Sequence, residues 1–384
     1  MINYGRHFID KADIKSVSKV LTSNNVTQGP FVKNFEKGLS SYFGAKYCMV
    51  VNSGTAALHL ACKALKIGTN DNIITTPITF ISTANSVIFN GANIDLIDID
   101  LNTYCIDLKK LENYLQKSKK KIKAIFFVDY AGNVLDWKKI KFLSKKYNFF
   151  TVNDNCHALG SRFKNSKRYA CRYADIVTQS YHPVKAITTG EGGSLMTNNR
   201  IFYDRVIKLR SHGIIKNNQI TLKNGNWFYK INELGYNYRI SDINCALGTS
   251  QLKKLDKFVK KRRAIAAVYD KNFKDIKFIK TPKIEKDVEH SYHLYVLLIN
   301  FKRFRITKKQ FFERLKKIGI NLQVHYIPIH YHNLYQKKLF YKSGSFPNSE
   351  KFYNYAVSLP IYFSLKHSQQ MMVIRKIKKT LNII

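Results

Sequence analysis

The segment Gln179-Ser-Tyr-His-Pro-Val-Lys185-Ala-Ile-Thr-Thr-Gly190-Glu-Gly-Gly193 is the most informative stretch of this sequence. It follows an apolar run that predicts a strand, and it brings a serine, a lysine and several glycines close together. Glycines permit turns and a close backbone approach that larger side chains would block. A lysine held in a partly buried loop can lose its proton and form a Schiff base with an aldehyde. Lys185 is therefore a candidate anchor for an aldehyde cofactor, although an isolated lysine before such a turn is ordinarily a surface residue.

A second segment, Val51-Asn-Ser-Gly-Thr55-Ala-Ala-Leu58, joins an apolar run to a run with helical spacing. The free amides and the dipole at the start of such a helix favour a phosphate group. Capping of the helix by Ser53 or Thr55 explains the same pattern equally well. The segment thus predicts either a phosphate site or an ordinary helix start.

The third segment is Thr151-Val-Asn-Asp154-Asn-Cys-His157-Ala-Leu-Gly160, in which Asp154 ends an apolar run. A carboxylate buried at the end of a strand can keep a pyridine nitrogen protonated, which strengthens the ring as an electron sink. A structural aspartate that caps the next turn is the alternative.

Short apolar runs alternate with helical stretches from about residue 45 to 200. This alternation predicts an α/β fold with a mainly parallel sheet covered by helices on both faces. Functional residues in such sheets gather at the carboxyl ends of the strands. The expected strands are Tyr47–Asn52, Asn72–Thr75, Asn93–Ile97, Ile122–Asp129, Phe149–Asn153 and Asp175–Ser180, and helices are expected to begin near Thr55, Phe80, Leu108, Asp136 and Arg200.

The pattern changes after Asp242. The expected order there is a long helix through Val268, a strand at His293–Leu298, a helix at Thr307–Ile318, a strand at Leu322–Tyr326 and a terminal helix. A chain of 384 residues exceeds what one hydrophobic core usually organises. We therefore expect a large cofactor-binding domain over residues 1–245 and a smaller C-terminal α+β domain over residues 246–384.

A possible phosphate site, an acidic residue and a lysine thus follow one another along the predicted sheet. In these segments the sequence resembles the nucleotide-sugar aminotransferases of the DegT/StrS type, which are fold-type I enzymes that depend on pyridoxal 5'-phosphate. The resemblance covers almost the whole chain. It implies that Lys185 binds the cofactor aldehyde and that Asp154 faces the pyridine nitrogen. It also implies that Thr55, Ala56 and Ser180 hold the phosphate.

The resemblance implies three further cofactor contacts. Phe80, in Thr76-Pro-Ile-Thr-Phe80, matches an aromatic residue that stacks on the cofactor ring, although a core phenylalanine is the alternative. His157 stands where many relatives have a glutamine that contacts the cofactor hydroxyl, so a hydrogen-bonding role is expected to survive with altered geometry. Asn237, in Leu234-Gly-Tyr-Asn-Tyr-Arg-Ile-Ser-Asp242, matches an asparagine that reaches the phosphate of the neighbouring subunit, which implies a homodimer with shared active sites.

Other segments resemble those that line the sugar-nucleotide pocket of this family. Their residues are Tyr4, Arg6, Thr27, Gln28, His325 and Tyr326. Within the family, the sequence from His182 to Gly193 is similar to that of enzymes that move the amino group of L-glutamate to carbon 4 of a UDP-linked 4-keto-6-deoxy-N-acetyl sugar. These enzymes act on the way to pseudaminic acid. Relatives that act on another carbon, or on a dTDP-linked keto sugar, differ by only a few pocket residues and remain the alternative.

One alternative function is a sugar dehydratase with the same fold, but such enzymes typically have histidine in place of the cofactor lysine.

A second alternative follows from the net charge of +40, which would suit a basic nucleic-acid-binding regulator. A general bias toward Lys, Asn and Ile explains the charge without any partner, and no helix-turn-helix or zinc-finger motif is present. We therefore expect no nucleic-acid partner.

The remaining composition places the chain in a cytoplasm. No run of eighteen apolar residues occurs, and the first residues lack the pattern of a signal peptide. The six cysteines form no C-x-x-C pair, which fits reduced and mostly buried thiols. The histidines lack the spacing of metal ligands. We therefore expect a cytoplasmic protein with no membrane insertion and no metal site.

Overall fold

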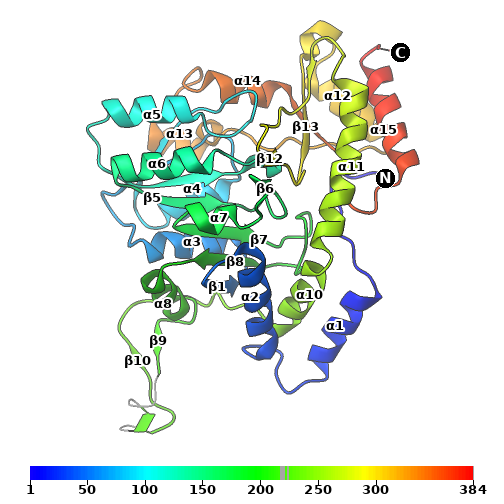
Figure 1. Ribbon diagram of the computed structural model, residues 1–384. Helices are drawn as coiled ribbons and strands as arrows, with labels where there is room; N and C mark the ends of the chain where they lie inside the picture. The colour runs from blue at the N-terminus through cyan, green and yellow to red at the C-terminus, as the bar shows by residue number, and fades with distance from the viewer. Residues whose placement is uncertain (217–220, 223–224, 384) are drawn as a thin grey trace.

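The computed structural model describes residues 1–384 apart from 217–220, 223–224 and 384. A seven-stranded sheet in the order β1-β8-β7-β5-β4-β2-β3 forms its centre (Figure 1). Neighbouring strands run parallel from β7 through β3, whereas β8 is antiparallel to both β1 and β7. The strands are β1 (Tyr47–Val51), β2 (Asn72–Thr75), β3 (Asn93–Leu96), β4 (Ile122–Val128), β5 (Phe150–Asp154), β7 (Ile176–Ser180) and β8 (Gly193–Thr197). The predicted mainly parallel sheet is confirmed.

Each of the six expected strands forms, and their ends differ from the prediction by at most one residue. Most residues of these strands are buried, and the longest strand, β4, is an almost continuous apolar run. Strand β8 was not among the predicted strands. Its five residues begin at a glycine and follow the glycine-rich loop directly, so the sequence around it has the character of a turn.

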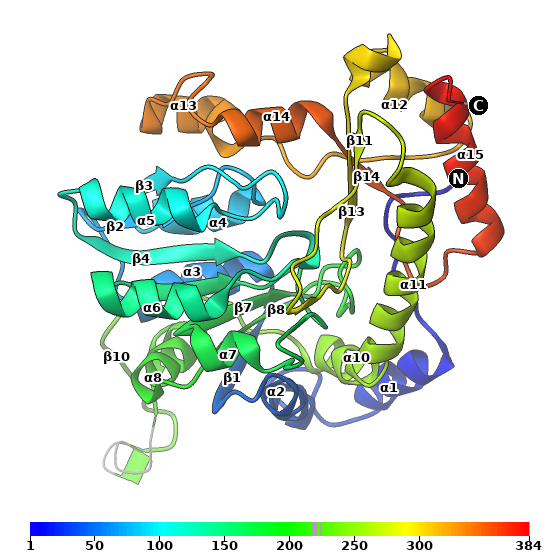
Figure 2. The same ribbon diagram turned by 45° about the horizontal axis from the view of Figure 1, so that its top comes forward.

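Helices cover both faces of the sheet, as Figure 2 shows. Apolar residues of α3, α4 and α8 pack into one core, and those of α2, α5 and α6 pack into the other. The five predicted helices are α3 (Gly54–Ala64), α4 (Ile81–Ile88), α5 (Leu108–Lys117), α6 (Trp137–Tyr147) and α8 (Arg200–Leu209). The chain also forms α1 (Lys11–Leu21), α2 (Pro30–Phe43), α7 (Tyr169–Tyr173), the 3-10 helix η1 (Tyr130–Gly132) and the short strands β6 (Arg162–Phe163), β9 (Ile214–Ile215) and β10 (Lys230–Ile231).

The C-terminal part contains its own three-stranded antiparallel sheet and a third apolar core. Its elements are α10 (Asp242–Leu252), α11 (Leu255–Phe273), β11 (Ile279–Lys280), β12 (Val288–Glu289), β13 (Tyr295–Ile299), η2 (Phe301–Phe304), α12 (Lys308–Lys317), η3 (Ile329–Tyr331), α13 (Asn333–Leu339), α14 (Pro347–Tyr355), β14 (Ala356–Leu359) and α15 (His367–Thr380). The exact domain boundary at residue 245 stays a prediction. No helix among the described residues is both apolar enough and long enough to span a bilayer.

Two predictions for this part are wrong. The long helix after Asp242 is two helices, because the chain turns at Lys254, whose ammonium binds the carboxylates of Asp10 (2.9 Å) and Asp13 (2.6 Å). The expected strand at Leu322–Tyr326 is irregular, with a single bridge between Gln323 and Ser358. The end of this segment is held by a side chain and not by a ladder of backbone hydrogen bonds, since the Tyr130 hydroxyl donates to the carbonyl of His325.

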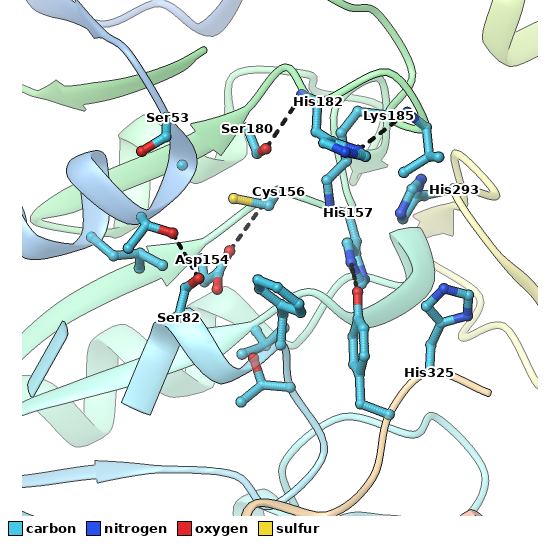
Figure 3. Close-up of a pocket in the computed structure, with 18 of the residues that line it drawn as sticks. Ser53, Ser82, Asp154, Cys156, His157, Ser180, His182, Lys185, His293 and His325 are labelled. Carbon is cyan, nitrogen blue, oxygen red and sulfur yellow. Dashed lines mark hydrogen bonds between the residues drawn. The ribbon is translucent and has the colours of Figure 1, made fainter. Parts of the chain in front are cut away.

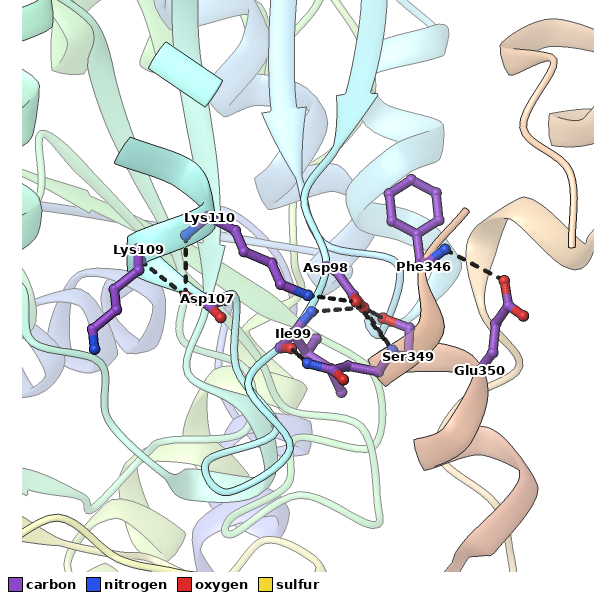
Figure 4. Close-up of polar contacts among 9 residues, drawn as sticks. Asp98, Ile99, Asp107, Lys109, Lys110, Phe346, Ser349 and Glu350 are labelled. Carbon is purple, nitrogen blue, oxygen red and sulfur yellow. Dashed lines mark hydrogen bonds and ion pairs between the residues drawn. The ribbon is translucent and has the colours of Figure 1, made fainter. Parts of the chain in front are cut away.

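Helix α14 is fixed to the large sheet by a buried carboxylate that follows β3 (Figure 4). Asp98 accepts hydrogen bonds from the backbone of Asn348 (3.0 Å) and from both the backbone (2.9 Å) and hydroxyl (2.7 Å) of Ser349. Lys110 completes the cluster at 2.9 Å. Burial raises the pKa of Asp98, but the donors from Ser349, Lys110 and Asn348 outweigh it and leave the pKa below its ordinary value. Asp98 therefore joins two segments that are distant in sequence.

Asp242, at the end of the segment that begins at Leu234, is bound to the segment that follows Thr27 and Gln28. Its side chain is fully buried and accepts from the backbone N–H groups of Gly29 (2.7 Å), Phe31 (2.9 Å) and Val32 (3.3 Å) at the start of α2. A carboxylate at a helix N-terminus satisfies free amides and complements the helix dipole. Asp242 thus gives the two segments a structural role.

Candidate active site

A cavity of about 420 Å³ lies at the carboxyl ends of the large-sheet strands, where segments of the C-terminal part close over it (Figure 3). Of the residues predicted for the site, those that line it are Tyr4, Thr55, Phe80, Asp154, His157, Ser180, Lys185, His325 and Tyr326. The fold thus gathers into one cavity residues that lie as far apart in sequence as Tyr4 and Tyr326.

One end of the cavity is a crossing of two backbones at the start of α3. A Cβ atom on Gly193 would lie 2.3 Å from the carbonyl oxygen of Ser53, and one on Gly54 would lie 2.8 Å from Cβ of Ser180. Only glycine fits at such distances, so these residues permit a tight cradle. The N-terminus of an eleven-residue helix opens into this cradle, which suits a phosphate.

Thr55 and Ala56 differ in what they offer to that cradle. The Thr55 hydroxyl lies 2.7 Å from the Ser82 hydroxyl at the cavity wall. Ala56 is buried, does not line the cavity, and its backbone N–H donates to Ser53 Oγ at 3.0 Å. Ser53 therefore caps the helix, and the capping and phosphate interpretations of this segment coexist.

Asp154 ends β5 and is 5% exposed, yet it lines the cavity. Its carboxylate accepts from the Thr83 hydroxyl (2.7 Å) and more weakly from the backbone N–H of Cys156 (3.3 Å). A carboxylate has about four acceptor positions, so it can still accept from a ligand N–H. The structural role as a turn cap and a ligand-binding role are thus compatible.

Lys185 projects into the same cavity from the loop between β7 and β8. The backbone N–H of Lys185 donates to the carbonyl of His182 (2.9 Å), which shapes the loop. Burial lowers the pKa of the Lys185 ammonium, and the nearby Cys156 and Asp154 partly offset that effect. A larger fraction of the amine is therefore neutral, which is the form that attacks an aldehyde.

His157 is held by both ring nitrogens. The backbone N–H of Ala131 donates to Nδ1 (3.2 Å), which places the ring proton on Nε2, and Nε2 lies 3.0 Å from the Tyr326 hydroxyl. Burial lowers the pKa of His157 far below its ordinary value, so the ring is neutral. The predicted contact of His157 with a cofactor hydroxyl stays a prediction, and it would have to compete with Tyr326.

Phe80 caps α4 and exposes 53% of its surface, so it is not the core phenylalanine of the alternative interpretation. Its ring lines the cavity, and its centroid lies 5.6 Å from that of Tyr326. An exposed aromatic face beside a cavity suits a flat ligand ring.

His325 and Tyr4 form the wall opposite the cradle, with ring centroids 4.9 Å apart. Nδ1 of His325 lies 2.8 Å from the Ser358 hydroxyl. Burial, followed by the charge of Lys185, lowers the pKa of His325 to about 3. The Ser358 contact gives His325 a structural role, and its place in the lining makes it accessible to a ligand as well.

Four further predicted residues do not line the cavity. Arg6 borders a small neighbouring cavity that Lys185 shares. Thr27 and Gln28 lie in the segment bridged to Ser241, away from the cavity of this chain. Asn237 also lies outside it, and its carbonyl accepts from the Asn52 side chain at 3.3 Å.

The sequence prediction missed several lining residues, among them Ser82, Cys156, His182, Glu191 and His293. Cys156, His182 and Glu191 lie inside the motifs and Ser82 lies two residues after Phe80, so proximity in sequence would have suggested them. His293 lies in no motif, and only the packing of the C-terminal part on the large sheet brings it to the cavity.

These residues fit pyridoxal 5'-phosphate. The cradle accommodates a phosphate, Asp154 can accept from a pyridinium nitrogen, and Lys185 offers an amine of lowered pKa. Phe80 adds an exposed aromatic face. Within the described part of the chain, no cluster of residues has the composition of a metal site.

Comparisons with known proteins agree with this site. The sequence profile of the DegT/DnrJ/EryC1/StrS aminotransferase family matches residues 7–378. The chain is 42% identical to the UDP-4-amino-4,6-dideoxy-N-acetyl-beta-L-altrosamine transaminase of Campylobacter jejuni, over 94% of this chain and 93% of that protein. It superposes on Helicobacter pylori PseC, an aminotransferase involved in the biosynthesis of pseudoaminic acid, with a TM-score of 0.90, 34% identity and full coverage of both chains. The PMP form of the putative sugar aminotransferase Spr1654 from Streptococcus pneumoniae superposes with a TM-score of 0.91 at 28% identity, also with full coverage.

Proposed function

Because this chain belongs to the DegT/DnrJ/EryC1/StrS aminotransferase family, we propose that it transfers an amino group from L-glutamate to carbon 4 of a UDP-linked 4-keto-6-deoxy-N-acetyl sugar. The chain is an aminotransferase that depends on pyridoxal 5'-phosphate, as its family is. The proposed sugar is supported by the 42% identity to the Campylobacter jejuni transaminase, whose name specifies a UDP-linked 4-amino-4,6-dideoxy-N-acetyl sugar, the aminated form of such a keto sugar. The family assignment favours an enzyme over the basic nucleic-acid-binding regulator.

Lys185 and Asp154 are the proposed catalytic residues. When bound, pyridoxal 5'-phosphate supplies an electrophilic carbon and an electron-withdrawing ring. Lys185 would hold this group through its neutral amine, and the same amine, once freed, would take a proton from the donor's α-carbon. The Asp154 carboxylate would keep a proton on the ring nitrogen. The lowered pKa of Lys185 supports its double role as nucleophile and base.

The other cavity residues are proposed to bind and orient. The start of α3 and Ser180 hold the phosphate, Phe80 stacks on the ring, and Tyr326 is oriented by His157. Tyr4 and His325 face the sugar. Ala56 lies in the first turn of α3, at the end of the helix that holds the phosphate.

We also propose a homodimer in which Asn237 reaches the cofactor phosphate of the neighbouring subunit, while Arg6, Thr27 and Gln28 contact the sugar nucleotide. Asn237 does not line the cavity of its own chain, which supports a contribution across a subunit interface, whereas Arg6 borders a smaller cavity that Lys185 shares. A cytoplasmic location is proposed from the six cysteines, all of which are free.

The observation that carries this proposal is the meeting of Lys185, Asp154 and the start of α3 in one cavity. The test is to supply L-glutamate with a panel of UDP- and dTDP-linked 3-keto and 4-keto sugars, and to measure both 2-oxoglutarate and the amino sugar. We expect equal amounts of both products with the UDP-linked 4-keto sugar. Product from a dTDP-linked or 3-keto sugar alone would refute the proposed substrate. Loss of water from the sugar without 2-oxoglutarate would identify a dehydratase instead.

A further inference from the structure

His293 is a cavity residue to which none of the motifs assigns a role. It lies just before β13 and is 5% exposed, and it lines the cavity together with Lys185. Figure 3 shows its ring on the side of the cavity that Lys185 enters. Nδ1 of the ring is buried and has no hydrogen-bond partner among the described residues. A buried polar atom without a partner costs free energy, so its retention calls for an explanation.

The ring is fixed in place by its neighbours. Its centroid lies 4.3 Å from that of His157, and its backbone carbonyl accepts from Nη1 of Arg262 at 3.2 Å. The same Arg262 nitrogen also binds the carbonyls of Tyr292 (3.2 Å) and Ile361 (2.8 Å). His293 thus presents its imidazole to the cavity from a rigid support.

The location of the ring proton follows from the burial of Nδ1. A buried N–H without an acceptor is rarer in proteins than an acceptor without a donor. The proton therefore belongs on Nε2, the nitrogen that is left accessible in a residue that lines the cavity. His293 is then a hydrogen-bond donor aimed at a ligand.

The ring is also neutral. Burial lowers the pKa of His293 far below its ordinary value, and neighbouring groups lower it further. Those groups are His157 at the end of β5, Lys185 on the loop after β7, Arg262 on α11 and His325 after α12. A neutral donor differs from an imidazolium because its binding strength does not depend on its own titration near neutral pH.

The amino-acid donor carries an α-carboxylate, and a residue close to Lys185 has to bind it. If Lys185 carries a proton from the donor's α-carbon, the carboxylate on that carbon lies near the lysine as well. No arginine of the same chain lines this cavity among the described residues, and Arg6 borders only the smaller cavity beside it. Of the other imidazoles that line it, His157 uses both nitrogens, His325 is bound to Ser358 through Nδ1, and the half-exposed His182 lies 4.0 Å from the carboxylate of Glu191.

We infer that His293 recognises the α-carboxylate of the amino-acid donor by donating a hydrogen bond from Nε2. This inference rests on the proposed function, because it takes the donor to be an α-amino acid that reacts beside Lys185. It distinguishes the two half-reactions, since a neutral sugar ring presents no such carboxylate. His293 is therefore a specificity residue for the amino donor and not for the keto sugar.

Two amines that differ only in this carboxylate test the inference. α-Methyl-L-glutamate has it but has no α-proton to lose, and 4-aminopentanoate has the same skeleton without it. Binding of each to the cofactor-loaded protein is measured by the change in visible absorbance, which needs no turnover. In His293→Leu we expect α-methyl-L-glutamate to bind about tenfold or more weakly, while binding of 4-aminopentanoate is unchanged.

Further variants separate the lost donor from general damage. His293→Gln keeps an N–H group and is expected to retain most of the preference for α-methyl-L-glutamate over 4-aminopentanoate. His293→Phe keeps the ring volume but has no N–H group, and it is expected to lose this preference. The matched control is His290→Leu, which alters the same segment at a buried ring whose Nδ1 accepts from Tyr292 at 2.8 Å and which does not line the cavity. We expect its preference to equal that of the unmodified protein.

Several results would overturn the inference. One is an equal loss of affinity for both amines in His293→Leu and His293→Phe, and another is no loss of affinity in either variant. A third is loss of the preference for α-methyl-L-glutamate in His325→Leu instead. A preference that grows as the pH falls below about 6.5 would show that the donor is an imidazolium and not a neutral ring. If neither amine changes the absorbance of the unmodified protein, the proposed function itself fails, and that outcome is distinct from the others.

Discussion

The reactivity of Lys185 is a property of its surroundings at the residue scale. Burial lowers the pKa of its ammonium, and Cys156 and Asp154 partly offset that effect. The same side chain on the surface would stay protonated at neutral pH. The cavity therefore converts an ordinary lysine into one that can attack an aldehyde.

Asp154→Asn tests the proposed role of the carboxylate. Asparagine keeps an oxygen that can accept from the Thr83 hydroxyl, so the variant should fold. Its neutral amide cannot hold a proton on the ring nitrogen, so the glutamate half-reaction should slow on the order of 100-fold. Stopped-flow absorbance measures that rate. Asp136→Asn, which changes a helix cap outside the cavity, should have no effect, and an unchanged rate in Asp154→Asn would remove the residue from the catalytic set.

Part of the site is readable from sequence because chemistry and local structure coincide there. Asp154 ends a strand, Lys185 and Thr55 follow strands, and the ends of neighbouring strands meet in space. His293 and the pairing of His157 with Tyr326 depend on contacts between distant segments. No periodicity or spacing records such contacts, so sequence patterns could not have predicted them.

At the scale of elements, the cradle depends on two backbones that almost touch. Strand β8 begins at Gly193 and passes the turn that starts α3, which leaves no room for a side chain. This explains why the glycine-rich loop accompanies the lysine in the sequence. The glycines shape the phosphate end, and the lysine serves the other end of the same cavity.

Gly193→Ala tests the cradle. Its Cβ would lie 2.3 Å from the carbonyl oxygen of Ser53, so the start of α3 must shift away from Ser180. We expect affinity for pyridoxal 5'-phosphate to fall about tenfold or more in a titration of the apoprotein. The matched control is Gly68→Ala, because a Cβ there meets nothing within 4 Å. Equal affinities in both variants would contradict the cradle.

Asp98→Asn tests the join between β3 and α14. The amide would turn a donor group toward donors from Ser349 and Asn348, so we expect a loss of about 1–3 kcal/mol in the free energy of unfolding. Thermal unfolding measures the change. Asp107→Asn is the control, since its exposed cap accepts only from the backbone of Lys109 and Lys110, and asparagine caps helices as well as aspartate does.

The pH dependence of the same join follows from the lowered pKa of Asp98. A carboxyl group whose pKa is lower in the folded state stabilises the protein above the unfolded pKa of about 3.9. That stabilisation is lost as the pH falls through the folded value. The difference between unmodified protein and Asp98→Asn should therefore be full at neutral pH and shrink in acid, and a difference that grows in acid would contradict this account.

Most elements of the large sheet could be predicted because a short, largely apolar run marks each predicted strand, and the helices between these strands have three-to-four spacing. The C-terminal part was harder. Helices α10 and α11 have no breaking residue between them, and an ion pair of Lys254 with Asp10 and Asp13 accompanies the turn. The segment at 322–326 has the composition of a strand but is held by side-chain contacts.

At the scale of the whole molecule, the proposed homodimer would complete each site with Asn237 of the other chain. Asn237 lies outside the cavity of its own chain. A second subunit can bring this residue to the phosphate end. The net charge of +40 would favour the anionic substrate without selecting it.

Hybrid dimers test whether the site is shared. Lys185→Ala and Asn237→Ala homodimers should each lack an intact site. In a hybrid of the two, the chain that keeps Lys185 would receive Asn237 from its partner, so one intact site should form and activity should return. The hybrid is isolated with two different affinity tags and assayed for amino transfer. A hybrid as inactive as both parents would show that Asn237 acts within its own chain, and an active Asn237→Ala homodimer would show that Asn237 is not needed.

The most direct measurement is to incubate the protein with pyridoxal 5'-phosphate, reduce it with borohydride and locate the modified residue by peptide mass spectrometry. We expect a single modified peptide with the cofactor on Lys185, and no stable labelling in Lys185→Ala. Labelling of another lysine, or labelling that persists in Lys185→Ala, would contradict the claim that this cavity is the active site.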